Sequence, residues 1–284
     1  MTLLVVGAGD LGLRVAGLVA AQGLPVVALK RRPVALPAGI EGLWADAAEL
    51  PALRPTRRFE VVLFCLTPDR RDPEAYRQTY VDRLRAVLDA TDRPGPPPRL
   101  LFAGSTAVYA AEDGRPVDED TPTDPSSDAA LPFNGRILRE SERLLAGRRE
   151  ACALRIGGIY GPGRDMLLRR LSTPGATVQR EPPLWTNRMH IDDVARAVLH
   201  LVALPQLPTI VNLVDDQPTP QADVLDGLAD LRGLPRLPAA PLDVLASQGK
   251  RVSNARLKAS GFHCRYPSWR EGYAAMLGGR DTAP

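Results

Sequence analysis

The chain has 284 residues, of which 44% are hydrophobic, 24% charged and 5% aromatic, and its formal net charge is +3. This composition is typical of a globular protein with room for one large α/β domain and a smaller lobe. The small, dispersed positive charge argues against a nucleic-acid-binding protein, and no apolar stretch approaches the roughly 20 residues that a membrane span requires.

Apolar runs alternate with helical patterns along the chain. The runs predict strands at 3–6, 25–29, 61–66, 99–103, 151–156 and 209–213, and the spacing of apolar residues predicts helices at 11–22, 74–90, 136–145, 191–204 and 221–231. This alternation predicts an α/β fold, a Rossmann-type doubly wound parallel sheet. Residues 113–132 are rich in acids, Pro, Ser and Thr, and we expect them to form a surface loop.

The three cysteines, Cys65, Cys152 and Cys264, are widely spaced and match no pattern of metal ligands. Their odd number predicts free thiols in a reducing compartment, which here means the cytoplasm. We expect no metal site.

A glycine-rich turn follows the first predicted strand and reads Gly7-Ala8-Gly9-Asp10-Leu11-Gly12. In such a turn Gly7 makes the tight bend, Gly9 lets a pyrophosphate approach the backbone, and Gly12 lets helix and strand pack closely. The N–H groups that open the helix then face the phosphates. We therefore expect the turn, with Asp10 and Leu11, to bind a dinucleotide; a glycine-rich turn without a ligand is the alternative.

Three cations, Lys30, Arg31 and Arg32, follow the second predicted strand, where an NAD-preferring protein carries an acid for the ribose 2′-hydroxyl. A guanidinium matches a 2′-phosphate bidentately, so the sequence predicts NADP in preference to NAD. A solvated basic turn is the alternative. Asp46, after a presumed third strand, is expected either to contact the adenine ring or to cap a helix.

Four further segments, at 103–110, 154–164, 190–195 and 212–216, read AGSTAVYA, LRIGGIYGPGR, HIDDVA and NLVDD. In this order they resemble segments of the extended short-chain dehydrogenases/reductases, a family of NAD(P)-dependent epimerases, dehydratases and reductases. The resemblance implies an NADP-binding domain over residues 1–160 with the helix near 190–204, and a smaller substrate lobe formed mainly by 161–284. It also implies cofactor contacts from Cys65, Leu66, Thr67, Gly104, Ser105 and Ile156.

The catalytic pair of that family is missing from this chain. The resemblance places the catalytic hydroxyl at Ser105, the Tyr at Asn134 and the Lys four residues later at Leu138. None of the six tyrosines has a lysine four residues after it. Asn has no useful acid–base pKa and Leu cannot hold ribose hydroxyls, so the usual proton relay is absent and the chain resembles atypical members of the family.

Several other side chains are candidates for chemistry. Ser105 would bond a substrate carbonyl or the nicotinamide amide, or else only stabilise a turn, and Tyr109 is expected to pack in the core rather than face the site. His190 is a candidate acid or base because histidine is the residue type that titrates near neutrality, but in the family pattern it begins a structural helix that Asp192 or Asp193 would cap.

Arg136 and Arg139 lie close to the vacated positions in the sequence. They are expected either to hold an anionic group of a substrate or the cofactor phosphates, or to form a solvated helix face paired with Glu140 and Glu142. The resemblance favours a small-molecule substrate, anionic or similar to a sugar nucleotide, and a homodimer formed through two helices that flank the sheet, here 74–90 and 136–145.

Two functions remain after nucleic-acid binding is set aside. The first is an NADP-dependent oxidoreductase, or an epimerase or dehydratase, with a non-standard active site. The second is a non-catalytic NADP(H)-binding sensor or interaction protein, which the missing Tyr and Lys favour. The sequence favours the enzyme.

Overall fold

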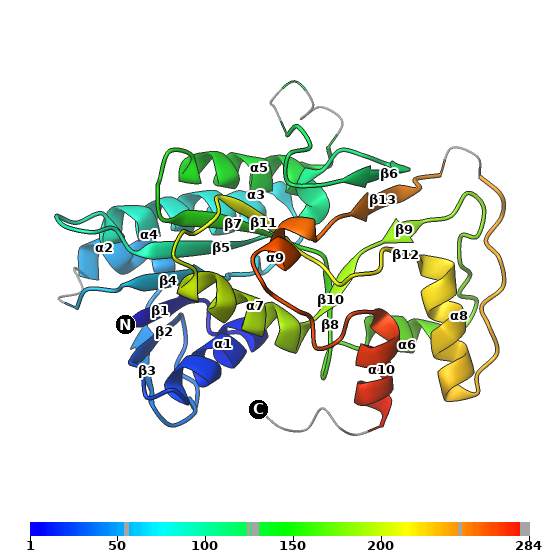
Figure 1. Ribbon diagram of the computed structural model, residues 1–284, viewed down its shortest axis with the longest axis horizontal. Helices are drawn as coiled ribbons and strands as arrows, with labels where there is room; N and C mark the ends of the chain where they lie inside the picture. Colours follow the sequence, from blue (N-terminus) through cyan, green and yellow to red (C-terminus); the bar gives the residue numbers. More distant parts are fainter. Residues whose placement is uncertain (54–56, 124–125, 127–130, 244–245, 279–284) are drawn as a thin grey trace.

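The computed structural model describes the whole chain except residues 54–56, 124–125, 127–130, 244–245 and 279–284. Its centre is a parallel sheet with the strand order β11-β7-β5-β4-β1-β2-β3 (Figure 1). The strands are β1 (Leu3–Val6), β2 (Val26–Lys30), β3 (Ile40–Trp44), β4 (Val61–Phe64), β5 (Arg99–Ser105), β7 (Ala151–Ile156) and β11 (Ile210–Leu213). The strand order changes direction between β1 and β4, as in a doubly wound Rossmann sheet, so the predicted fold class is confirmed.

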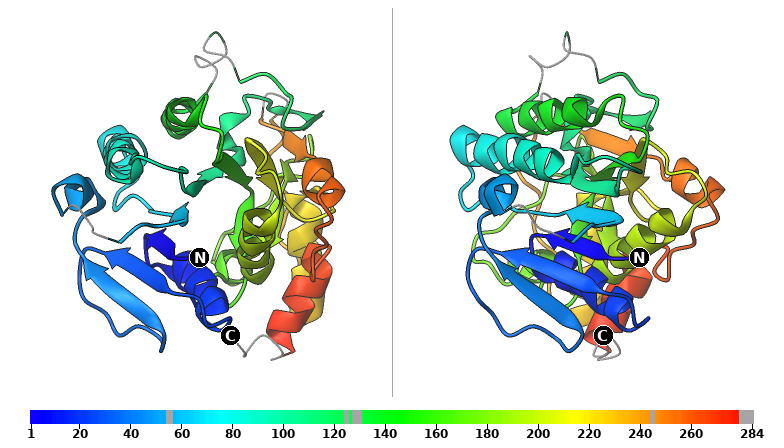
Figure 2. Two further views of the ribbon diagram at one scale, coloured as in Figure 1. Left: turned by 60° about the vertical axis from the view of Figure 1, so that its left-hand side comes forward. Right: turned by 90° about the vertical axis from the view of Figure 1, so that its left-hand side faces the viewer.

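Helices cover both faces of this sheet (Figures 1 and 2). On one face α1 (Asp10–Ala20) and α7 (Ile191–Ala203) share a core with Leu3 and Val5, and on the other α4 (Arg83–Thr91) and α5 (Phe133–Leu145) share a second core with Leu4 and Val6. The central strands β1 and β4 are apolar throughout because alternate side chains enter two separate cores.

The helical layer over β4 contains a widened turn. Asp72 caps α3 (Pro73–Arg77), a π-helical turn η2 (Gln78–Asp82) follows, and α4 continues to Thr91. The sequence predicts one helix from 74 to 90 here, and the widened turn lies within that range. Such turns are rare and are frequently found at functional sites.

A smaller lobe lies beyond the end of the sheet, on the right of Figure 1. Its four-stranded sheet has the order β12-β9-β13-β6, and a strand pair β10-β8 links it to the Rossmann sheet. Tyr160, Trp269 and Tyr273 are buried in its core. The elements are β6 (Asp113–Val117), β8 (Gly158–Tyr160), α6 (Met166–Leu171), β9 (Trp185–Thr186), β10 (Arg188–His190), β12 (Thr219–Pro220), α8 (Gln221–Arg232), β13 (Gly249–Val252) and α10 (Trp269–Leu277).

Residues 113–132 were predicted to be a loop, and for β6 that prediction is wrong. β6 pairs in parallel with β13, whose residues come more than 130 positions later, and Glu119 beyond it is buried and accepts the backbone N–H of Asn212 at 2.8 Å. The composition of β6 (DGRPV) is unusual for a strand, and β6 forms because its distant partner β13 stabilises it. Residues 124–125 and 127–130 of the predicted loop lie outside the described residues.

Four short helices complete the structure: η1 (Ala47–Glu49), α2 (Leu50–Leu53), η3 (Thr106–Val108) and α9 (Ala255–Ala259). Among the described residues no helix is both long enough and apolar enough to cross a membrane.

The two sheets do not divide cleanly at residue 160. β6 precedes residue 160 but belongs to the small sheet, and β11 follows residue 160 but belongs to the large sheet. The domain boundary near 160 therefore stays a prediction.

Candidate functional site

A cavity of about 240 Å³ opens at the carboxyl ends of β1, β2, β3 and β4. This is where the strand order reverses, the position at which open α/β sheets bind their ligands. The cavity is lined by Gly7, Ala8, Gly9, Leu29, Lys30, Arg31, Ala45, Ala47, Cys65, Leu66, Thr67, Asp69, Thr79 and Arg83.

Each glycine of the turn after β1 has a distinct environment. Gly7 has a φ of +111°, and a Cβ there would lie 2.9 Å from the carbonyl of Cys65. A Cβ on Gly12 would lie 2.2 Å from the oxygen of Gly7, whereas one on Gly9 would meet nothing within 4 Å. Gly7 and Gly12 are therefore required by the backbone, and Gly9 leaves open space beside the first turn of α1.

The first turn of α1 has no side-chain cap, since Gly9 occupies the N-cap position. Helix N-termini carry unsatisfied N–H groups and a partial positive charge, and both favour phosphate. The turn thus has the room and the donors that the diphosphate of a dinucleotide requires.

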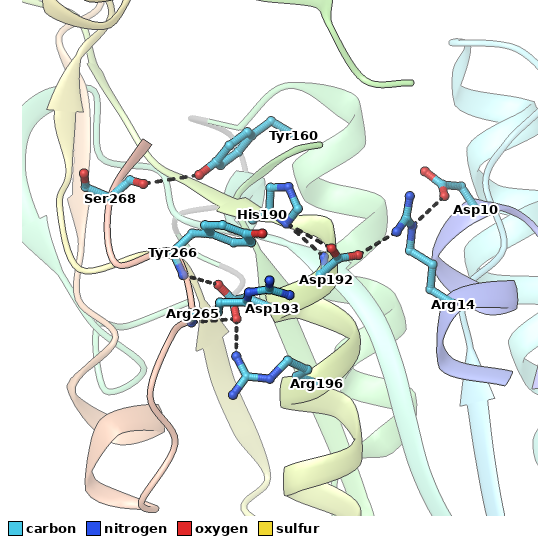
Figure 3. A network of polar contacts seen from close by, with 10 residues as sticks. All are labelled: Asp10, Arg14, Tyr160, His190, Asp192, Asp193, Arg196, Arg265, Tyr266 and Ser268. Carbon is cyan, nitrogen blue, oxygen red and sulfur yellow. Dashed lines mark hydrogen bonds and ion pairs between the residues drawn. The ribbon is translucent and has the colours of Figure 1, made fainter. Parts of the chain in front are cut away.

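Asp10, inside this turn, is held by two arginines, of which Figure 3 shows Arg14. Its carboxylate accepts hydrogen bonds from Arg14 at 3.0 Å and from Arg164 at 2.7 Å, and Arg14 also bonds Asp192 at the start of α7 at 2.6 Å. Burial alone would raise the pKa of Asp10, but the bonds from Arg164 and Arg14 outweigh burial and lower it. The two guanidinium groups offset a negative charge that would otherwise repel a phosphate at this turn.

The three predicted cations at the end of β2 differ in position. Lys30 and Arg31 line the cavity, and Arg32 is exposed beside it. Arg31 donates two hydrogen bonds of 2.6 Å each to Asp69, and these bonds lower the pKa of that carboxyl group. A bidentate ion pair therefore lies at the mouth of the cavity.

Asp46 was predicted to contact adenine or to cap a helix, and the structure shows the cap. Its carboxylate accepts the N–H of Ala48 in a capping box with Glu49, and Arg83 donates to both oxygens at 2.7 and 2.8 Å. The bonds from Arg83 lower the pKa of Asp46. Ala45 and Ala47 line the cavity on either side, but Asp46 itself does not.

Cys65 lines the cavity at the end of β4 as a neutral thiol. Its Sγ lies 3.2 Å from the carbonyl oxygen of Gly7, and burial raises its pKa to about 12. It can pack against a ligand but cannot act as a thiolate nucleophile at neutral pH.

Other predicted cofactor residues lie outside the cavity wall. Leu11 and Ile156 are buried in the core between α1, α7 and the sheet, and Gly104 and Ser105 end β5 farther along the sheet edge. The residues that sequence reasoning missed are Ala8, Leu29, Ala45, Ala47, Asp69, Thr79 and Arg83. Of these, Thr79 and Arg83 reach the cavity from the π turn and the start of α4.

The reaction end, where the resemblance places catalysis, lies at the end of β5 and the start of α5. Ser105 caps η3 by accepting the N–H of Ala107 at 3.2 Å, and a Cβ on Gly135 would lie 2.5 Å from the oxygen of Ala107. Leu138 is 3% exposed and lies in the core, while Asn134 is half-buried. The start of α5 is thus packed tightly against the turn that holds Ser105.

Two cationic side chains converge on this turn. Arg139, fully buried, donates to the carbonyl oxygen of Val108 at 2.7 Å, and Lys250 donates to that of Tyr109 at 2.6 Å. Burial lowers the pKa of Lys250, although Glu112 lies 3.7 Å from its Nζ. Arg139 comes from α5, whereas Lys250 comes from β13 in the other lobe.

A buried polar network lies behind the reaction end. Arg155 donates to both oxygens of Glu142 at 3.0 and 2.7 Å and lies over the ring of Tyr109, whose hydroxyl donates to Asn212 at 2.8 Å. Tyr109 is therefore a buried packing residue, as expected. Glu142 pairs with Arg155 of β7, not with the arginines of its own helix.

His190 is fully buried between aromatic rings (Figure 3). Its Nδ1 accepts the N–H of Asp192 at 3.3 Å, so His190 itself caps α7, and its ring packs on Tyr160 and Tyr266. The expectation that Asp192 or Asp193 caps this helix is wrong. Asp193 instead accepts the backbone N–H groups of Arg265 and Tyr266, both at 2.8 Å, and ties the C-terminal segment to α7.

A second hollow, of about 590 Å³, lies at the opposite edge of the sheet and is lined in part by Met1, Glu60 and Arg99. Although larger, it lies at the amino ends of the strands and has no glycine turn. Arg99 is used there to bond the carbonyls at the end of α7. No group of three or more His, Cys, Asp or Glu side chains in the described part of the chain could hold a metal ion.

A parallel seven-stranded sheet with a glycine turn and a cavity at its switch point defines a dinucleotide-binding protein of the Rossmann class. The family profile described as the NAD dependent epimerase/dehydratase family matches residues 3–213. The chain belongs to this family, as its sequence motifs suggest. No curated protein gave a significant match.

Solved structures of related proteins cover nearly the whole chain. A Methylobacillus flagellatus protein classed as an NAD-dependent epimerase/dehydratase is 35% identical, with a TM-score of 0.78 and 98% of both chains covered. A conserved protein of unknown function from Silicibacter pomeroyi is 28% identical, with a TM-score of 0.74 and 99% coverage of both. MoeE5, solved with UDP-glucose and NAD, is 22% identical with a TM-score of 0.78, covers 98% and 97%, and shares the fold.

Proposed function

We propose that the protein binds NADP(H) in the cavity beside the glycine turn, in preference to NAD(H). The observation that carries this proposal is the replacement of the usual acid after β2 by Lys30, Arg31 and Arg32, two of which line the cavity. The open space at Gly9 and the uncapped first turn of α1 support a diphosphate in the same cavity.

We further propose that the protein is an oxidoreductase, epimerase or dehydratase with a non-standard active site. A bound nicotinamide supplies hydride transfer, and this chain supplies the groups around it. Ser105 provides a hydroxyl at the end of β5, and Lys250 brings an ammonium group to the carbonyl of Tyr109. The positive charge of Lys250 at this end favours a small anionic substrate, and MoeE5, which shares the fold, was solved with a sugar nucleotide.

A second candidate is a non-catalytic NADP(H)-binding sensor. The observation that favours it is Leu138, which by the resemblance stands in place of the family's Lys and is buried in the core, where it cannot donate a hydrogen bond to a ribose. Steady oxidation of NADPH by any carbonyl compound or sugar nucleotide, at enzyme-like rates, would contradict this alternative.

The experiment that tests cofactor binding is a calorimetric titration of the purified protein with NADPH and with NADH. We expect tighter binding of NADPH, and we expect the double variant Arg31→Gln/Arg32→Gln to remove at least about tenfold of the difference, as lost charge-assisted bonds to a phosphate should. Binding of neither cofactor would overturn the proposal.

We also propose a homodimer in the cytoplasm. The helices predicted to form the dimer lie side by side, with Arg77 of α3 bonded to Glu140 of α5 at 2.7 Å, and the three cysteines are free thiols. Light scattering coupled to gel filtration tests the oligomeric state.

A further inference from the structure

The pair Arg31–Asp69 spans the entrance of the cavity. Arg31 follows β2 and Asp69 follows β4, and β1 lies between these two strands in the sheet. Because neighbouring strands lie about 4.8 Å apart, the ends of β2 and β4 are about 10 Å apart. The two side chains therefore meet across the end of β1, directly outside the glycine turn.

Arg31 uses both terminal nitrogens in this pair. Its Nη1 and Nη2 each donate to one oxygen of Asp69 at 2.6 Å. A phosphate would engage a guanidinium through the same parallel pair of N–H groups. The carboxylate of Asp69, whose pKa is lowered by the bonds from Arg31, is ionised at neutral pH and occupies the position that a phosphate would take.

The bridge is exposed and can open. The side chains of Arg31 and Asp69 are 53% and 64% exposed, and ion pairs of this kind are weak and screened by salt. Arg83, the other arginine of the cavity wall, is bound to Asp46 in a pair only 20% and 24% exposed. Lys30 and Arg32 form no ion pair within the part of the chain that the structure describes. Arg31 is thus the cation whose availability depends on a single exposed acid.

We propose that Asp69 is a specificity-determining residue that competes with the 2′-phosphate of NADP(H) for Arg31. This inference rests on the proposed binding of NADP(H). NAD(H), which carries a 2′-hydroxyl instead, does not need Arg31 and can bind while the bridge stays closed. Asp69 therefore reduces the difference in affinity between NADP(H) and NAD(H) that the three cations alone would give.

The test is a calorimetric titration of Asp69→Asn with NADPH and with NADH. We expect about fivefold tighter binding of NADPH, the effect of releasing one exposed ion pair, and NADH binding within about twofold of the parent protein. In an Arg31→Gln background the gain should disappear, as expected if the two residues are coupled. Equal unfolding midpoints would show that each variant is folded.

The matched control is Asp72→Asn, in the same loop. It removes the same charge, Asn caps a helix as well as Asp does, and Asp72 does not line the cavity. Three results would overturn the role of Asp69: equal gains in Asp69→Asn and Asp72→Asn, equal gains for both cofactors, or a gain that survives in the Arg31→Gln background. Absence of binding in the parent protein would instead overturn the proposed function, and this inference with it.

Discussion

The cavity beside the glycine turn, called here the adenosine end because the proposed cofactor would place its adenosine there, is built differently from the reaction end of the site. The adenosine end depends on the backbone: a positive φ at Gly7, open space at Gly9 and helix N–H groups without a side-chain cap. The reaction end depends on side chains, with Leu138 in the core and Arg139 and Lys250 bonded to neighbouring carbonyls. A site formed by backbone groups tolerates substitution of most of its side chains. A site formed by side chains changes its chemistry with each substitution.

This difference would allow a chain to keep its glycine turn while the residues that its family uses for proton transfer change, as the sequence predicts for this chain. At the glycine turn only Gly7 and Gly12 must be kept, because neither position has room for a Cβ. Chemistry at the other end is free to change, because it depends on a few positions such as Asn134 and Leu138.

The largest effect should come from the buried pair behind the reaction end. Glu142→Leu leaves Arg155 buried without its partner, and removal of one member of such a pair costs about 3–5 kcal/mol of unfolding free energy. Glu140→Leu, on the same helix but in a half-exposed pair with Arg77, should cost less than about 1 kcal/mol. Urea unfolding measures both. Similar losses of unfolding free energy in the two variants would show that the burial of the Arg155–Glu142 pair does not set its contribution to stability.

An intermediate effect should come from the turn itself. In Gly12→Ala the added Cβ would lie 2.2 Å from the oxygen of Gly7, so the turn must shift, at a cost of about 1–3 kcal/mol and about tenfold in affinity for NADPH. Gly17→Ala, in the same helix with nothing within 4 Å, should instead stabilise the protein by about 0.5–1 kcal/mol. If Gly12→Ala binds NADPH normally, the adenosine end does not depend on this backbone.

The smallest effect should come from Ser105→Ala. Loss of the η3 cap should lower the unfolding free energy by about 1 kcal/mol, and binding of NADPH should change less than twofold, because Ser105 lies outside the adenosine cavity. Once a substrate is identified, kcat separates two roles: a drop of tenfold or more indicates contact with the reacting groups, and an unchanged kcat leaves only the cap.

The sequence predicts most of the Rossmann half, because its information is local. The first strand, the glycine turn and the first helix follow one another within 20 residues, and apolar runs mark each buried strand. The NADP preference also comes from three adjacent cations, although it is still a prediction.

Residues that depend on distant partners could not be predicted. Asp69 lies in a loop without periodicity and reaches Arg31 only because β1 separates β2 from β4. Lys250 reaches the reaction end from β13, and β6 forms only against that same strand. His190 had two alternatives in sequence, and only the bond that its Nδ1 accepts from the N–H of Asp192 shows that it acts as a helix cap.

The exchange of β6 and β11 between the two sheets has a consequence for synthesis on the ribosome. The large sheet lacks its edge strand until Leu213 has emerged, and β6 waits unpaired until β13, near Val252, is made. A nascent chain therefore cannot complete its N-terminal half first and its C-terminal half later, as multidomain proteins generally do. The large sheet must wait for Leu213 and the small sheet for Val252, so β6 stays without its strand partner while more than 130 further residues are made.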